Sequence, residues 1–211
     1  MAEPARDLTA SGPRLTLRYP RPDDAPRLYE LASDPEVTRP FSWGPYERQA
    51  DAADWIATLP RNRADGLALE FAIADPADWP VGVISLIEVS LRDRRGVIGI
   101  WLGRAYWGSG VGDEAEAMLA RIAFEPLRME RLGAWVDVNN ERSRRAFERL
   151  GFSNEGVLRS FQRHQDRPHD LVSYALLRDE WASSEMAAVP VELAGEPPPA
   201  FVCAPRLTIG G

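Results

Sequence analysis

Three glycines at alternate positions, Gly108, Gly110 and Gly112, separate an apolar stretch from an amphipathic one. The apolar residues 97–102 predict a strand, and apolar residues recur at helical spacing over residues 110–124. The first backbone N–H groups of a helix have no partner within the helix, and glycine lets a ligand approach the main chain closely. This junction therefore predicts a binding site for an anion such as a diphosphate.

Two well-known nucleotide-binding loops do not fit these glycines. A Walker loop needs Lys followed by Ser or Thr after its last glycine, whereas Asp113 and Glu114 follow Gly112. The dinucleotide fingerprint needs two residues between its second and third glycines, whereas Val111 alone separates Gly110 from Gly112. Taken alone, the stretch could still be a glycine-rich turn that binds nothing.

A second motif follows after the predicted helix and one further predicted strand. Asn140 and Ser143 stand at the start of a short predicted helix that ends in Leu-Gly-Phe at residues 150–152. In this order the two motifs resemble the two conserved blocks of the GNAT N-acetyltransferases. Residues 106–110, Tyr-Trp-Gly-Ser-Gly, are most similar to the branch that contains the ribosomal-protein N-terminal acetyltransferases. The resemblance covers residues 14–181.

The resemblance implies a mixed α/β fold with flanking helices and a central, mostly antiparallel sheet in which one parallel pair of strands splays apart. In the family, a bulge in the strand before the glycine turn opens a wedge for the pantetheine arm of acetyl-CoA, the implied cosubstrate. Here the arm would lie between residues 97–102 and 132–138. Backbone groups of Ile100, Trp101 and Leu102 would pair with the arm, and an N–H there would face the thioester oxygen.

The resemblance also implies which residues bind the rest of the cofactor. The main-chain amides that would hold the diphosphate belong to Trp107, Gly108, Ser109, Gly110, Val111 and Gly112. Asn140 matches the family's pantetheine-contacting Asn, although a simple helix cap explains it as well. Asp113 and Glu114 would repel phosphate if they faced it, so we expect both side chains to point outward.

The position of the catalytic acid departs from the common family pattern. Many members carry a Tyr that protonates the leaving thiolate where this chain has Phe147, and a phenyl ring cannot donate a proton. Phe147 is therefore expected only to contact the cofactor. Ser143 lies one helical turn earlier on the same face, and the ribosomal branch implies that this hydroxyl is the acid. The alternative is a first-turn serine with no chemical role.

The general base is less clearly marked in the sequence. Glu88, near the end of its predicted strand, is the first candidate, and Asp137, at the end of the strand beside the wedge, is the second. Residues 159–162, where this branch can also carry a carboxylate, have none, so a water relay stays open. His164 and His169 lie on a predicted turn without the spacing of a metal site, and no metal is predicted.

The resemblance thus implies an acetyl-CoA-dependent N-acetyltransferase that acts by direct attack of a primary amine, without an acyl-enzyme. The acceptor would be a protein N-terminus or a small-molecule amine, and an acyl group larger than acetyl is not excluded. Phe147 and the unassigned base leave a second interpretation, a catalytically silent acyl-CoA-binding sensor or scaffold of the same fold.

The periodicity of apolar residues predicts the strands and helices that position these residues. Further strands are expected at residues 15–19, 69–74, 81–89, 131–138, 152–158 and 171–176. Helices are expected after Asp24 and over residues 47–59. The loop between these two helices carries Phe41, Trp43 and Tyr46, which could line a substrate pocket or anchor the loop to the core.

Length and composition fit one globular domain. The chain has 211 residues, 45% of them hydrophobic, and we place the domain at residues 14–182. A flexible arm (1–13) would precede it and a Pro-rich tail (183–211), which could dock, would follow. The net charge of −7 with dispersed basic residues does not favour nucleic acid, and no stretch predicts a membrane span. The single cysteine, Cys203, favours the cytoplasm, and the resemblance leaves a homodimer open.

Overall fold

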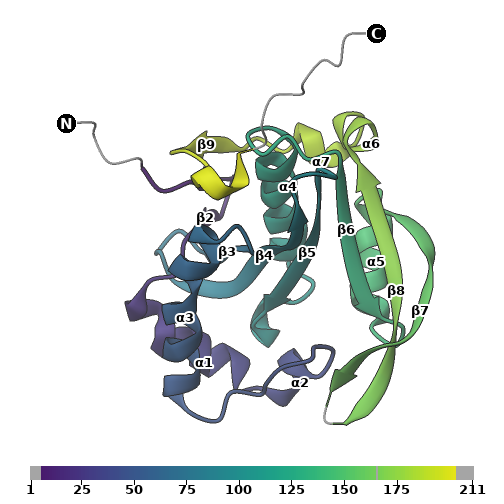
Figure 1. The fold of residues 1–211 in the computed structure, drawn as a ribbon. Coiled ribbons are helices and arrows are strands. Elements are labelled where there is room, and N and C mark those ends of the chain that lie inside the picture. The colour runs from purple at the N-terminus through teal and green to yellow at the C-terminus, as the bar shows by residue number, and fades with distance from the viewer. Residues whose placement is uncertain (1–5, 165, 203–211) are drawn as a thin grey trace, which may run out of the picture.

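The computed structural model describes residues 6–164 and 166–202, in which nine strands form a single sheet (Figure 1). The strand order is β7-β8-β6-β5-β4-β3-β2-β1-β9, and each neighbouring pair is antiparallel except β5 with β6. The strands are β1 (Thr9–Ser11), β2 (Thr16–Arg18), β3 (Leu69–Ala74), β4 (Pro80–Ser90), β5 (Arg95–Leu102), β6 (Arg131–Asp137), β7 (Ser153–His164), β8 (Arg167–Leu177) and β9 (Glu192–Ala194).

Helices cover both faces of the middle of this sheet. They are α1 (Ala25–Ala32), α2 (Pro35–Thr38), α3 (Gln49–Ala64), α4 (Val111–Phe124), α5 (Glu141–Arg149), α6 (Arg178–Ala182) and α7 (Glu185–Ala188), with 3-10 turns η1 (Pro22–Asp24), η2 (Arg104–Tyr106) and η3 (Pro199–Phe201). β3 is buried at every position because one face meets the main core around α4 and the other faces the helices α1 and α3. Among the described residues, none of the helices combines the length and the hydropathy that a membrane span requires.

The parallel strands β5 and β6 pair only over their first halves. The pairing runs from Arg95 opposite Arg131 to Ile98 opposite Ala134. Beyond that point β5 stays with β4 and β6 stays with β8, so the two strands diverge toward their C-terminal ends (Figure 1). The predicted splayed pair is therefore confirmed, and it opens on the side where α2 and the tip of the β7–β8 hairpin lie.

The prediction that a bulge in β5 creates this divergence is wrong. β5 keeps continuous register with β4 from Val97 to Leu102, and the register shift of this pair lies between Ile87 and Ser90 instead. Gly82 explains the close pairing, because a Cβ at this position would lie 2.2 Å from the carbonyl oxygen of Trp101. The C-terminal end of β5 thus pairs with β4 and does not pair with β6.

The two ends of the described chain extend the sheet. The sequence predicts a flexible arm over residues 1–13, whereas residues 9–11 form β1, which pairs with both β2 and β9, and Leu8 is 1% exposed. The tail supplies β9 and the fully buried Phe201. Three-residue strands show no alternation that could be recognised beforehand. Residues 1–5 and Cys203 lie outside the described part of the chain.

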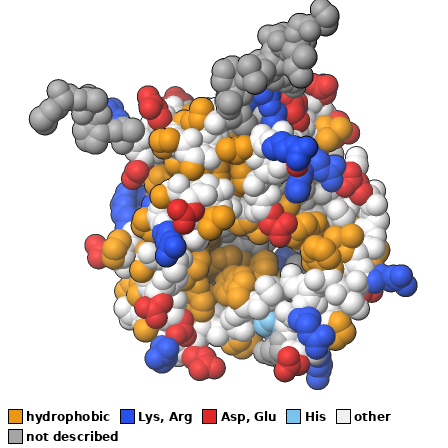
Figure 2. Space-filling model, viewed as in Figure 1, with side chains coloured by type: hydrophobic (Ala, Val, Ile, Leu, Met, Phe, Trp, Pro, Cys, Tyr) orange, Lys and Arg blue, Asp and Glu red, His pale blue; other side chains and the backbone are white. Residues whose placement is uncertain are grey.

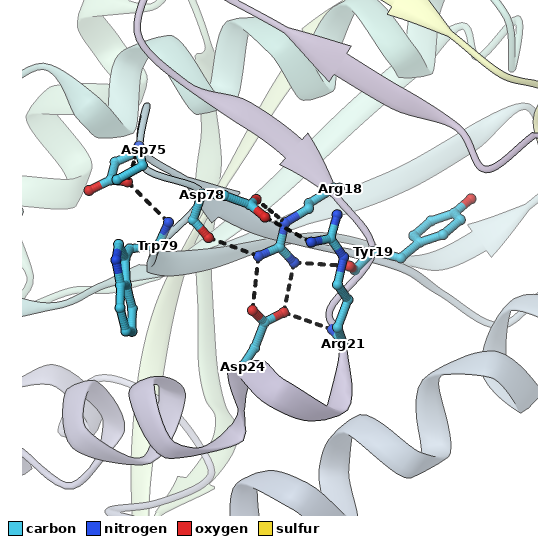
Figure 3. A network of polar contacts seen from close by, with 8 residues as sticks. Arg18, Tyr19, Arg21, Asp24, Asp75, Asp78 and Trp79 are labelled. Carbon is cyan, nitrogen blue, oxygen red and sulfur yellow. Dashed lines mark hydrogen bonds and ion pairs between the residues drawn. The ribbon is translucent and has the colours of Figure 1, made fainter.

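An ion-pair network centred on the buried pair Arg18 and Asp24 attaches the start of α1 to the sheet (Figure 3). The guanidinium of Arg18, on β2, donates to both carboxylate oxygens of Asp24 at 2.7 and 2.9 Å. It also donates to Asp78, on the turn between β3 and β4, at 2.5 Å, and Arg21 reaches the same carboxylate at 2.7 Å. Paired charges with several hydrogen bonds tolerate burial, so this network fixes α1 and the α2 segment that follows it.

Candidate active site

A cavity of about 630 Å³ occupies the space between the diverging strands. Its walls come from the last residues of β5 and β6, the glycine turn, the first two turns of α5 and the segment around α2. Figure 2 shows a hollow on the face in view, with hydrophobic side chains gathered beside it. The predicted residues that line this cavity are Ile100, Trp101, Leu102, Trp107, Gly108, Ser109, Gly110, Gly112, Asn140, Ser143 and Phe147.

The glycine turn exposes a run of main-chain amides to this cavity. Gly108 and Gly110 have φ angles of 71° and 80°, which side-chain-bearing residues rarely adopt. Gly110 is the N-cap of α4, and within the described residues the amides of Gly108, Ser109, Gly110 and Gly112 have no hydrogen-bond acceptor. The turn therefore presents unsatisfied donors at a helix N-terminus, which suits a diphosphate.

Two of the predicted amide donors are already engaged. The amide of Trp107 donates to the carbonyl of Arg104 at 3.2 Å, and that of Val111 donates to Ser109 Oγ at 3.4 Å. The Val111 side chain is buried in the core, whereas the Trp107 indole donates to the Leu102 carbonyl at 2.9 Å and lines the cavity. Fewer of the six amides are thus free to bind a diphosphate than the sequence predicts.

The prediction that the acidic residues at the start of α4 point outward is wrong for Glu114, which is buried, whereas the Asp113 side chain is 38% exposed at the rim of the cavity. Glu114 is 7% exposed and accepts hydrogen bonds from the amides of Arg14 and Leu15 and from Arg14 Nε at 2.8 Å. Asp113 lines the cavity and pairs with Arg149 at 2.8 Å. Each carboxylate is compensated by an arginine, which limits its repulsion of a phosphate bound at the turn.

The start of α5 carries the predicted acid. Asn140 caps the helix by accepting from the Ser143 amide at 3.2 Å, which confirms the cap. It also lines the cavity, and its contact with pantetheine stays a prediction. The Ser143 hydroxyl lines the cavity without a hydrogen-bond partner among the described residues. Phe147 is 3% exposed and packs against Phe152 and Tyr174. Ser143 is therefore the hydroxyl of this helix that is free to donate into the cavity.

The structure does not bring Glu88 to the site, which contradicts its predicted role as the base. Its side chain is exposed, its φ is 49°, and it is absent from the cavity lining. The physical reason is strand direction: Ile87 lies opposite Val97, at the opposite end of β5 from the glycine turn. The second candidate, Asp137, does line the cavity.

A second cavity of about 600 Å³ adjoins the first and shares Pro40, Trp107, Asp137, Asn140 and Arg142 with it. Asp137 is 7% exposed, and its Oδ2 lies 2.5 Å from Nδ1 of His169, which lines this second cavity. Burial raises the pKa of Asp137, but hydrogen bonds from His169 and Asn139 outweigh it and leave the pKa below its usual value. The sequence gives no signal for this contact, because it depends on how β6 pairs with β8.

The aromatic loop before α3 both lines the cavity and anchors itself. Phe41 lines the cavity and stacks on Trp43, whose ring also contacts Tyr46 and forms a T-shaped pair with Trp101. The prediction that the loop anchors itself is confirmed for Trp43 and Tyr46. Phe41 lines the cavity, and a role of that cavity in binding substrate stays a prediction. Of the three aromatic residues of this loop, Phe41 thus contributes its ring to the cavity wall.

Glu116 is a buried acid in the cavity wall that the sequence analysis missed. It is 3% exposed, and burial raises its pKa to about 8, with Asp113 adding to the rise and Arg149 opposing it. An acidic residue on a helix is ordinarily read as solvent-facing, so periodicity gave no signal. At neutral pH this carboxyl is therefore mostly protonated.

Glu116→Gln is expected to make thermal stability less dependent on pH. Between about pH 4.3 and 8 the folded state holds a proton on Glu116 that the unfolded state releases, so stability falls as pH rises and levels off above pH 8. Calorimetric Tm values at pH 6 and 9 should differ by ~5 °C less in the variant than in the wild type. An exposed control, Glu192→Gln, should show the same fall in Tm from pH 6 to pH 9 as the wild type. If Glu116→Gln also showed the wild-type fall in Tm, a buried, protonated carboxyl at this position would be contradicted.

Comparison with known proteins agrees with this geometry. The family profile described as "Acetyltransferase (GNAT) domain" matches residues 14–153. The chain is 32% identical over 170 residues to "Uncharacterized N-acetyltransferase p20" of Bacillus licheniformis, covering 80% of this chain and 96% of the relative. It is 33% identical over 172 residues to "Putative ribosomal N-acetyltransferase YdaF" of Bacillus subtilis (strain 168), covering 79% and 93%. The chain belongs to the GNAT acetyltransferase family.

The GNAT fold is also found in solved structures. The acetyltransferase MccE of microcin C7 self-immunity, crystallised with acetyl-CoA and AMP, superposes with a TM-score of 0.72 at 24% identity, covering 78% of this chain and 93% of MccE. GNAT acetyltransferases use acetyl-CoA, and this GNAT chain is an N-acetyltransferase. Its free turn amides fit the diphosphate of that cosubstrate, and the edges of β5 and β6 that have no strand partner fit the amides of its arm.

Proposed function

We propose that this GNAT enzyme transfers the acetyl group of acetyl-CoA to a primary amine by direct attack. The observation that carries the proposal is the cavity between β5 and β6, which extends from the glycine turn to the aromatic segment around α2. One end suits the diphosphate and the other suits an acceptor, so the two substrates would meet between the strand ends. No covalent acyl-enzyme is needed when both substrates are bound together.

The pantetheine arm would pair with the free edge of β5 from Gly99 to Leu102, where β6 has moved away. Charge develops on the thioester oxygen as the amine attacks, and a fixed main-chain N–H of this edge would stabilise it more in the transition state than in the ground state. Asn140 would contact the arm from the start of α5. The C–S bond then breaks, and Ser143 would donate its proton to the departing thiolate while its oxygen takes up the second proton released by the former amine nitrogen, which leaves a neutral amide, a thiol and an unchanged serine.

The acceptor side of the cavity indicates the class of amine. Its walls are apolar or aromatic, from Val37, Pro40, Phe41, Trp101, Trp135 and Leu171. The carboxylates nearby are already paired, Glu36 with Arg39 and Glu141 with Arg145. A polyamine needs several free carboxylates for its ammonium groups, whereas a peptide N-terminus offers one amine beside apolar chain. We therefore propose an N-terminal α-amine, in keeping with the name of the relative YdaF.

A thiol-release assay over a panel of amines tests this proposal. Unblocked peptides should cause release of free CoA. The rate of release should be at least tenfold lower with the same peptides Nα-acetylated, and it should be low with spermidine. Preference for spermidine would contradict the acceptor class. Tight acetyl-CoA binding by calorimetry without thiol release from any amine would contradict the enzyme and favour the silent sensor.

A further inference from the structure

Asp137 and His169 form a pair at the boundary between the two cavities. Asp137 is the last residue of β6, and its partner in the sheet register is Leu171, two residues after His169 on β8. Residues two apart on a strand share a face, so Asp137 and His169 lie on the same face as Trp135. Leu171 and Trp135 line the acceptor side of the main cavity. The pair therefore faces the side where the amine would arrive.

The hydrogen bonds of the pair fix how the imidazole can act. Oδ1 of Asp137 accepts from the backbone amide and the side-chain amide of Asn139 at 2.8 and 3.1 Å. Oδ2 lies 2.5 Å from Nδ1 of His169. Because the ionised carboxylate of Asp137 can only accept, we assign the proton of the neutral imidazole to Nδ1, which leaves the lone pair on Nε2. Within the described ranges Nε2 has no hydrogen-bond partner, and the side chain is 23% exposed.

We infer that His169 Nε2 is the general base that takes the proton from the acceptor ammonium, with Asp137 as the positioning residue; the inference rests on the proposed function. The N–H bond of the ammonium breaks as Nε2 gains the proton, and the freed lone pair on nitrogen attacks the acetyl carbon. Nδ1–H stays on the imidazole, and the Asp137 charge stabilises the imidazolium that forms. The proton then leaves through the second cavity, which His169 lines.

Other charges around the imidazole are largely compensated. They are Glu36 from α2, Arg39 directly after α2, Glu141 and Arg142 from α5, His164 from β7 and the neighbouring Asp170 on β8. Glu36 pairs with Arg39 at 3.3 Å, Glu141 pairs with Arg145 at 2.7 Å, and Asp170 accepts from the Ser160 amide at 2.7 Å. Arg142 stacks over the Trp107 ring at 3.5 Å. Asp137 is thus the charge in direct contact with His169.

Asp137 itself is a poorer candidate for the base. Both its oxygens accept hydrogen bonds, and those bonds keep its pKa below the usual value, which weakens it as a proton acceptor. Its place behind His169 matches the role of a carboxylate that orients an imidazole. The geometry therefore favours His169 as the base and Asp137 as the residue that orients it.

The pH dependence of kcat/KM for an unblocked peptide tests this pair, with His169→Gln, Asp137→Asn and His164→Gln measured alongside the wild type. A peptide α-amine titrates near pH 8 and is partly neutral at pH 7.5, so His169→Gln should lose only about tenfold there. The loss of kcat/KM in His169→Gln relative to the wild type should be larger below pH 7 and only about twofold at pH 9.5. Asp137→Asn should follow the same trend, and His164→Gln should match the wild type.

Rescue separates chemistry from structure. His169→Ala should regain activity when imidazole is added to the buffer, while its acetyl-CoA affinity stays within about threefold of wild type. A merely structural role predicts an equal loss at every pH, a lower Tm and no rescue, and that result would overturn the inference. If instead the wild type acetylates amines and His169→Gln has the same pH profile as the wild type, His169 is not the base but the proposed function stands. Absence of acetylation by the wild type would overturn both.

Discussion

Replacing Gly108 by aspartate is expected to weaken acetyl-CoA binding about thirtyfold. Nothing lies within 4 Å of the position that a Cβ would take at Gly108, so the side chain has room at the turn. Its carboxylate would stand beside the bound diphosphate, and like charges about 5 Å apart in a medium of dielectric constant near 30 repel by ~2 kcal/mol. Calorimetric titration of acetyl-CoA measures the change in Kd directly.

Gly108→Asn is the matched control, since it has the same shape without the charge. Both residues tolerate the left-handed φ of 71° at this position better than most others. The asparagine variant should therefore bind acetyl-CoA within about threefold of wild type, and the aspartate variant should improve as salt screens the repulsion. Equal affinities for the two variants would show that the diphosphate does not bind at this turn.

Ser143→Ala is expected to lower kcat about a hundredfold and leave the Kd for acetyl-CoA within about twofold. The hydroxyl lines the cavity one helical turn before Phe147, whose ring cannot supply a proton. Without it the thiolate must leave unprotonated or take its proton from water, and the transition state rises in energy. Steady-state kinetics with an unblocked peptide give kcat, and calorimetry gives the Kd.

The amide of Ser143, which holds the Asn140 cap, is unchanged by this substitution, so the helix should persist. A Tm near that of the wild type would show that the variant is folded. If kcat stays within twofold of wild type in that folded variant, Ser143 is only a first-turn hydroxyl and the proton comes from elsewhere.

The parts of the site that the sequence could predict are local in the chain. The glycine turn needs only Gly108 and Gly110 at positions of positive φ followed by a helix, and a few consecutive residues show that. Asn140 and Ser143 likewise share one helix start. Backbone geometry over a single turn fixes such features, so residue spacing suffices to recognise them.

The parts that it could not predict depend on pairing between distant strands. Glu88 reads as a strand-end carboxylate, yet the register of β4 with β5 places it far from the turn. The contact between Asp137 and His169 joins residues 32 apart and follows from the register of β6 with β8. A shift of one residue in either register would move each side chain to the opposite face. The spacing of residues along the chain cannot predict that register.

Calorimetric titration of the intact, folded chain with acetyl-CoA tests the central claim most directly, since everything proposed for this site requires the cofactor to lie between β5 and β6. We expect saturable binding of one acetyl-CoA per chain with a Kd in the micromolar range, abolished by excess CoA. No heat of binding from protein whose unfolding transition is intact would contradict the account.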